Sequence, residues 1–82
     1  MTTSETPQLD IAKEPTNTQR IAWAWAALRA FCKAEGVVPD PTPEDDLTDL
    51  VTDLMHLCAV EHISFNRILD RAEMHFETER HE

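Results

Sequence analysis

Apolar residues recur every three or four positions along three stretches of the chain, a spacing typical of the buried face of an α-helix. The stretches cover about residues 17–35, 43–61 and 64–80. Their apolar positions are, in order, Ile21, Ala24, Trp25, Leu28, Phe31 and Cys32; Leu47, Leu50, Val51, Leu54, Leu57 and Cys58; and Phe65, Ile68, Leu69, Ala72 and Phe76. The single Gly, the absence of Tyr and the scattered β-branched residues also favour helices over a sheet.

Residues that commonly cap helices stand at the ends of these stretches. Thr16 or Thr18 can cap the first helix, and Gly36 can end it in the left-handed conformation. Thr42 precedes a proline and two acids, which predicts the start of the second helix, and Ser64 can cap the third. Because the connections are short, the pattern predicts an all-α fold, a compact three-helix bundle.

The first fifteen residues show no sustained period and contain two prolines. We therefore expect a flexible, disordered tail at 1–15 in front of a three-helix domain at 16–82. No apolar run approaches the length of a membrane span, and the N-terminus has no apolar signal segment. These features predict a cytoplasmic protein in which Cys32 and Cys58, both on apolar stripes, remain reduced core residues.

Charge is the most distinctive property of the composition. The chain has sixteen Asp and Glu residues and only seven Lys and Arg residues, which gives a formal net charge of −9. Eight of the acids lie between residues 34 and 66, a segment without Lys or Arg. Such a surface repels phosphate backbones and anionic lipids, so we expect no direct nucleic-acid binding and no membrane binding. A basic protein surface is the expected partner, contacted by Glu44, Asp45, Asp49 and Asp53 of the second helix.

The first helix has a second, narrower apolar strip, formed by Trp23, Ala27, Ala30 and Ala34. A tryptophan on a face otherwise made of alanine can fill a groove in another chain, and the alternative is that the third helix covers it. The small residues allow close helix approach in either case. We expect this strip to be the interface of a homodimer, and Trp23 also to contact a partner.

One row of side chains could bind a metal ion. Asp46, Asp49, Asp53 and His56 follow one another at three, four and three positions along one edge of the second helix. Carboxylate and imidazole groups at this spacing suit a divalent ion. The row resembles the Glu-x-x-Glu and Glu-x-x-Asp pairs with which all-α nucleotide pyrophosphohydrolases of the MazG kind bind magnesium. That resemblance implies an alternative function, a minimal metal-dependent hydrolase with the three aspartates as ligands.

The departures from that family favour a different interpretation. Its sites need acids on two helices and usually cations for the phosphates, whereas this chain has one row with no basic residue near it in sequence. A solvated acidic face is therefore the preferred interpretation. The histidines His56, His62 and His75 could also converge, but no Cys-x-x-Cys or His-x-x-x-His motif accompanies them. We expect no metal site and no cofactor.

Ingredients for other catalysis are scarce. Ser64 is expected to be a cap, both cysteines are expected to be buried, and Gly36 stands alone instead of in a phosphate-binding loop. We therefore expect no catalytic residue and no enzymatic activity.

The segment 45–80 has a further resemblance. Its acid–leucine run and the helix after it are similar to short open reading frames of unassigned function on bacterial plasmids and phages. The residues that carry the similarity are Asp46, Leu47, Asp49, Leu50, Asp53, Leu54, His56 and Leu57, followed by Phe65, Leu69, Ala72 and His75. This resemblance implies an accessory protein of a mobile element. The sequence thus predicts a non-enzymatic protein-interaction module, either a structural or regulatory accessory or an anti-defence inhibitor whose acidic surface imitates nucleic acid.

Overall fold

The computed structural model describes residues 15–81, which form three α-helices and no strand. The helices are α2 (Asn17–Glu35), α3 (Glu44–Val60) and α4 (Phe65–Glu79). The predicted all-α class and the three-helix bundle are confirmed, and the predicted helix ends are matched to within one residue. The expected tail falls almost entirely within residues 1–14, outside the described residues.

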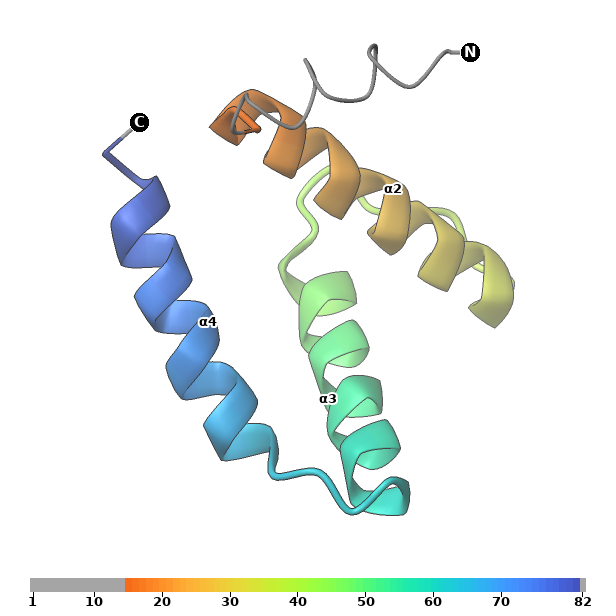
Figure 1. Ribbon diagram of the computed structural model, residues 1–82. Coiled ribbons are helices and arrows are strands. Elements are labelled where there is room, and N and C mark those ends of the chain that lie inside the picture. The colour runs from red at the N-terminus through yellow and green to blue at the C-terminus, as the bar shows by residue number, and fades with distance from the viewer. Residues whose placement is uncertain (1–14, 82) are drawn as a thin grey trace, which may run out of the picture.

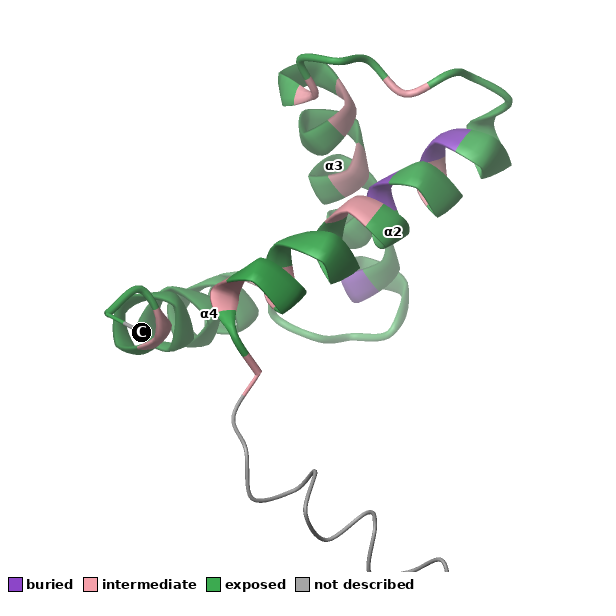
Figure 2. Ribbon diagram, turned by 90° about the horizontal axis from the view of Figure 1, so that it is seen from above, coloured by how far each residue is buried: buried purple, intermediate pink, exposed green. Residues whose placement is uncertain are grey.

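The helices form an open frame, in which α2 is the crosspiece and α3 and α4 are the two legs (Figure 1). Helix α2 crosses above the other two, α3 descends beneath it, and α4 returns antiparallel to α3 so that its C-terminal end lies near the N-terminal end of α2. Seen along the perpendicular view, α4 lies towards one end of α2 and α3 towards the other (Figure 2). Contacts between α2 and α3 and between α3 and α4 hold the frame together.

Polar groups join the two ends of the frame where α2 begins and α4 ends. The Arg20 guanidinium forms a salt bridge with Glu79, with 3.3 Å between Nε and Oε1. The Asn17 side-chain amide donates to the backbone carbonyl of Glu79 at 2.8 Å, and its oxygen accepts from Arg20 at 2.8 Å. The two bonds to Glu79 connect residues that are about sixty positions apart in sequence, so they fix the end of α4 relative to the start of α2.

Capping at three of the predicted positions, Thr16, Gly36 and Ser64, is confirmed. Thr16 and Gln19 form a capping box, in which each side chain accepts from the other residue's backbone N–H at 3.1 and 2.9 Å. Gly36 adopts a left-handed conformation with φ 80°, and Ser64 accepts from the backbone N–H of Arg67. These interactions satisfy backbone groups that a helix end leaves unpaired.

The prediction that Thr42 caps α3 is wrong. Pro43 occupies the capping position, and no side chain caps the helix there. The backbone N–H and the hydroxyl of Thr42 instead donate to the Asp40 carboxylate at 2.9 and 3.0 Å. Asp40 in turn donates its own backbone N–H to Asp46 at 2.9 Å. The Thr42 hydroxyl is thus bonded within the connector and does not accept from a backbone N–H in the first turn of α3, as a capping hydroxyl would.

The buried core of the described residues is small. The buried hydrophobic residues are Leu28 and Cys32 of α2 and Cys58 of α3, and α4 has none. Both cysteines are free and buried, as expected. Most other residues of the predicted stripes stay exposed within one chain, including Leu54 and Leu69 at 42% and 44%. The expected burial of these stripes is wrong for the single chain, because α3 and α4 approach their neighbours over only part of their length.

Candidate protein-interaction surfaces

Four carboxylates from two helices gather where the end of α2 meets α3. Glu35 is the last residue of α2, and Asp46, Asp49 and Asp53 follow one edge of α3. Desolvation at this crossing raises the pKa of Glu35, and the charges of Asp49, Asp53 and Asp46 raise it further. We refer to these four residues as the acidic cluster.

A buried thiol lies beside the acidic cluster. Cys32 is fully buried where α2 rests on α3. Burial raises the pKa of its thiol, and the charge of Asp46 and a hydrogen bond to that carboxylate act in the same direction. Asp46 thus serves the packing of α3 against α2 and, through the backbone of Asp40, the connector between them. The thiol stays protonated at neutral pH, which does not suit a nucleophile.

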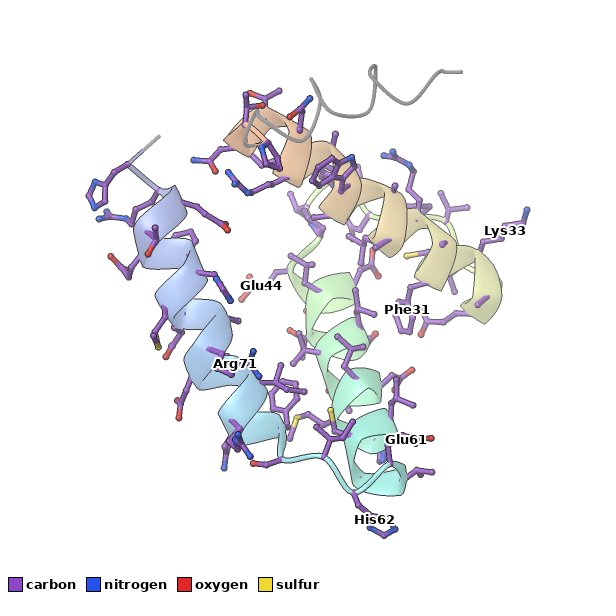
Figure 3. The ribbon with its side chains drawn as sticks, viewed as in Figure 1. Phe31, Lys33, Glu44, Glu61, His62 and Arg71 are labelled. Carbon is purple, nitrogen blue, oxygen red and sulfur yellow. The ribbon has the colours of Figure 1, made fainter. Side chains whose placement is uncertain are left out.

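No cation neutralises the acidic cluster within the described residues. The two salt bridges there, Arg20 with Glu79 and Arg80 with Glu77, both lie at the opposite end of the frame. Lys33 is close to Glu35 in sequence, but its side chain points away from α3 (Figure 3). The helix dipole adds to the imbalance, because Glu35 stands at the negative end of α2.

The acids predicted to bind a partner are all accessible. Glu44, Asp45, Asp49 and Asp53 are exposed, whereas Asp46 is half-buried. Sequence reasoning missed Glu35 as a member of the same surface. Its charge was visible in the sequence, but its contact with the α3 row depends on where α2 crosses α3, for which the sequence pattern carries no signal.

The strip of small residues on α2 is also accessible. Trp23 is 58% exposed, and Ala27, Ala30 and Ala34 are exposed beside it. Trp23 is nine positions from Cys32, about two and a half turns of helix, so the two side chains project on opposite sides of α2. Neither α3 nor α4 covers the strip, which answers the alternative that the third helix packs there. We refer to these residues as the Trp23 strip.

A third surface is an apolar groove beneath α2, between the two legs of the frame. One hollow of about 190 Å³ is lined by Ile21, Ala24, Trp25, Leu28, Pro43 and Leu47. A second hollow of about 330 Å³ shares Ile21 and Ala24 with the first and extends to Phe76, Glu79 and Arg80 of α4. The shared residues make the two hollows continuous, so the groove runs from the start of α3 to the end of α4.

The described residues contain no group of three or more His, Cys, Asp or Glu side chains placed to hold one metal ion. The row of Asp46, Asp49 and Asp53 therefore does not form such a group, and neither do the three histidines. His62 is used differently, since it sits at the turn after α3 with φ 59° (Figure 3). None of the described helices is long and apolar enough to cross a membrane.

Comparison of the chain with protein-family models, with curated proteins and with solved structures found no match.

Proposed function

We propose that this chain is a non-enzymatic protein-interaction module that binds a basic partner through its acidic cluster and works as a homodimer. The acidic cluster is the observation that carries the proposal. Four carboxylates lie together, and neither salt bridge of the described residues reaches them. Their mutual repulsion disfavours the free cluster, so a cationic surface that binds there relieves repulsion in addition to forming new ion pairs.

The chemistry of the acidic cluster limits the kind of partner. A surface that binds nucleic acid is rich in Lys and Arg, because it must neutralise phosphates. The acidic cluster carries negative charge, as phosphates do, so such a surface attracts it. This supports the anti-defence version of the proposal, in which the chain occupies a nucleic-acid-binding site. A structural or regulatory accessory that binds another basic protein is the second version. In both versions the Trp23 strip, on the side of α2 opposite Cys32, offers a separate apolar contact.

Capture of partners from the host with charge variants tests the proposal. The wild-type chain is compared with the double variant Asp49→Lys, Asp53→Lys, whose positions lie beyond the first turn of α3 and are exposed. The matched control, Asp70→Lys with Glu77→Lys, makes the same change in net charge at exposed positions of α4 that lie away from Leu69 and Phe76. Circular dichroism establishes that each variant remains helical before capture.

The proposal expects a basic protein that wild type and control retain and that the α3 variant loses. Its retention should fall steeply as salt rises, because the screening length shortens from ~10 Å at 0.1 M to ~3 Å at 1 M. A nucleic-acid-binding protein among the retained species favours the anti-defence version. If the α3 variant retains the same proteins as wild type with the same salt dependence, the acidic cluster is only a solubilising surface and the proposal is wrong.

A further inference from the structure

The apolar groove is larger than its lining hollows alone suggest. Val51 and Leu54 are four and seven positions after Leu47, so they lie on the same side of α3. Leu69 is seven positions before Phe76 and shares its side of α4 by the same rule. The exposed fractions of the large groove residues are 59% for Ile21, 45% for Leu47, 42% for Val51, 42% for Leu54, 44% for Leu69 and 61% for Phe76. The groove is thus bordered by apolar side chains from all three helices, each about half uncovered.

We infer that a second copy of the chain occupies this groove, so that the homodimer is joined by the inner faces of α2, α3 and α4 and not by the Trp23 strip. The inference rests on the homodimer of the proposed function, but it does not depend on the basic partner. An isologous contact about a two-fold axis uses the same patch on both copies. The groove can contact the same groove of a second copy, because its lining on both α3 and α4 is apolar.

The area of the groove fits a stable dimer. Six side chains with about half of their ~100–200 Å² uncovered offer ~300–600 Å² of apolar surface per copy. A stable interface buries about 800 Å² per partner, of which roughly 55–65% is apolar. The groove therefore supplies the apolar share of one such interface. The Trp23 strip offers one large side chain among alanines, which is far less.

Charge also selects the groove over other faces for contact between copies. Two chains of net charge −9 repel each other, so they approach best through their least acidic surface. Around α3, Val51 projects about 160° and Leu54 about 100° from Asp53, so the groove and the acidic cluster lie on different sides of that helix. Glu44 is the acid of α3 that lies beside Leu47 and Val51. Arg20, Glu79 and Arg80 line the groove where α4 ends, and Arg20 pairs there with Glu79, so this end adds no net negative charge. A dimer joined at the groove keeps the two acidic clusters apart and faces them outward.

The described residues bury few hydrophobic side chains within one chain. Three buried hydrophobic residues make a very small core for a domain of this size, and small domains commonly gain the missing burial by oligomerisation. Helix α4 has the clearest need, since its apolar stripe has no buried residue. A second copy in the groove would cover that stripe without changing any helix.

Sedimentation of the full chain from about 1 µM to about 100 µM provides the first test. The wild type should sediment as a dimer, and its Tm should rise with concentration, because association stabilises only the folded state. Leu69→Glu should weaken the dimer at least tenfold in Kd, since it places a carboxylate on the groove side of α4. Trp23→Glu makes the same kind of change on the Trp23 strip and should leave the dimer intact. A monomeric wild type, or dissociation by Trp23→Glu alone, would overturn the inference.

A second measurement needs no variant. In a mixture of isotope-labelled and unlabelled chains, filtered nuclear Overhauser effects report only contacts between copies. They should connect the Leu69 and Val51 methyl groups with the Phe76 ring. Cross-peaks from the Trp23 indole in their place would assign the interface to the Trp23 strip. Contacts of the groove methyl groups with residues 1–14 of the same chain, in a monomeric protein, would show that the groove is covered from within, which also contradicts the inference.

Discussion

Replacement of Leu28 by alanine measures how much the small core contributes to stability. Leu28 is 2% exposed and lies where α2 rests on α3. The change removes three carbon atoms from a buried site, which costs ~2.4 kcal/mol at ~0.8 kcal/mol for each. The additional cost of the cavity should be small, because Leu28 borders a hollow of about 190 Å³. We therefore expect a loss of ~2–3 kcal/mol in the free energy of unfolding.

This loss is large relative to the total. A chain of 82 residues has an expected stability of ~4–12 kcal/mol at ~0.05–0.15 kcal/mol per residue. At ~4–8 °C per kcal/mol for a domain of this size, Tm should fall by ~8–24 °C. Thermal unfolding followed by circular dichroism measures the change, at one fixed protein concentration so that association does not contribute.

A matched control removes the same atoms from an exposed site. Leu57 of α3 is 56% exposed and lies outside the apolar groove, so Leu57→Ala should cost less than ~1 kcal/mol. If Leu28→Ala and Leu57→Ala lower Tm equally, the core is not at the crossing of α2 and α3, and the arrangement of the helices derived from it is wrong. If Leu28→Ala abolishes helicity altogether, urea unfolding of the milder Leu28→Val gives the same comparison.

Three further predictions concern single groups. Because its surroundings raise the pKa of Glu35, its charged form is disfavoured in the folded state, and stability is lost as pH rises from the unfolded pKa through the folded one. Glu35→Gln should therefore raise Tm at pH 7. It should not raise Tm below about pH 4, because glutamate is protonated there in both the folded and the unfolded state. An equal gain in Tm at both pH values would refute this reasoning. His62 has φ 59°, a conformation that costs a non-glycine residue ~1–2 kcal/mol. His62→Gly removes this strain but adds the entropic cost of ordering a glycine, so the free energy of unfolding should rise by up to ~1 kcal/mol. Urea titrations measure the change. Calorimetry with magnesium, manganese and zinc should show only weak, salt-sensitive binding, and a stoichiometric interaction that Asp49→Asn with Asp53→Asn removes would revive the hydrolase alternative.

Local signals in the sequence predicted the helices well. Thr16, Gly36 and Ser64 act at the predicted ends, because capping depends on a few neighbouring residues. The same reasoning failed at Thr42, where the Asp40 carboxylate takes both of its donors. It also gave no signal for His62, which ends α3 with the hydrogen-bond pattern that glycine usually supports.

The candidate surfaces were only partly predictable. The acids of α3 and the Trp23 strip follow from composition and helical spacing, and the structure places all of these residues except the half-buried Asp46 on exposed positions. The addition of Glu35 to the acidic cluster depends on the crossing of α2 and α3, which spacing does not determine. The apolar groove was missed for a related reason. Periodicity identifies which side of a helix is apolar, but it does not distinguish burial within one chain from burial between chains.

The separation of the apolar groove from the acidic cluster leads to a last prediction about partner binding. If two copies meet at the groove, the dimer presents two outward acidic clusters related by a two-fold axis. A partner that is itself dimeric, or that has repeated basic sites, can then engage both clusters, and such bivalency can strengthen binding by ~10²–10⁴-fold without any new contact.

Leu69→Glu, which leaves every residue of the cluster unchanged, should therefore release a bivalent partner at lower salt than wild type does. Each remaining single contact should keep its dependence on salt, because the charges that meet are the same. Forced dimerisation of this variant, by fusion to a coiled coil with a long flexible linker, should restore retention. If the variant is monomeric and yet holds the partner as well as wild type does, one cluster is enough and the symmetry of the dimer plays no part in recognition.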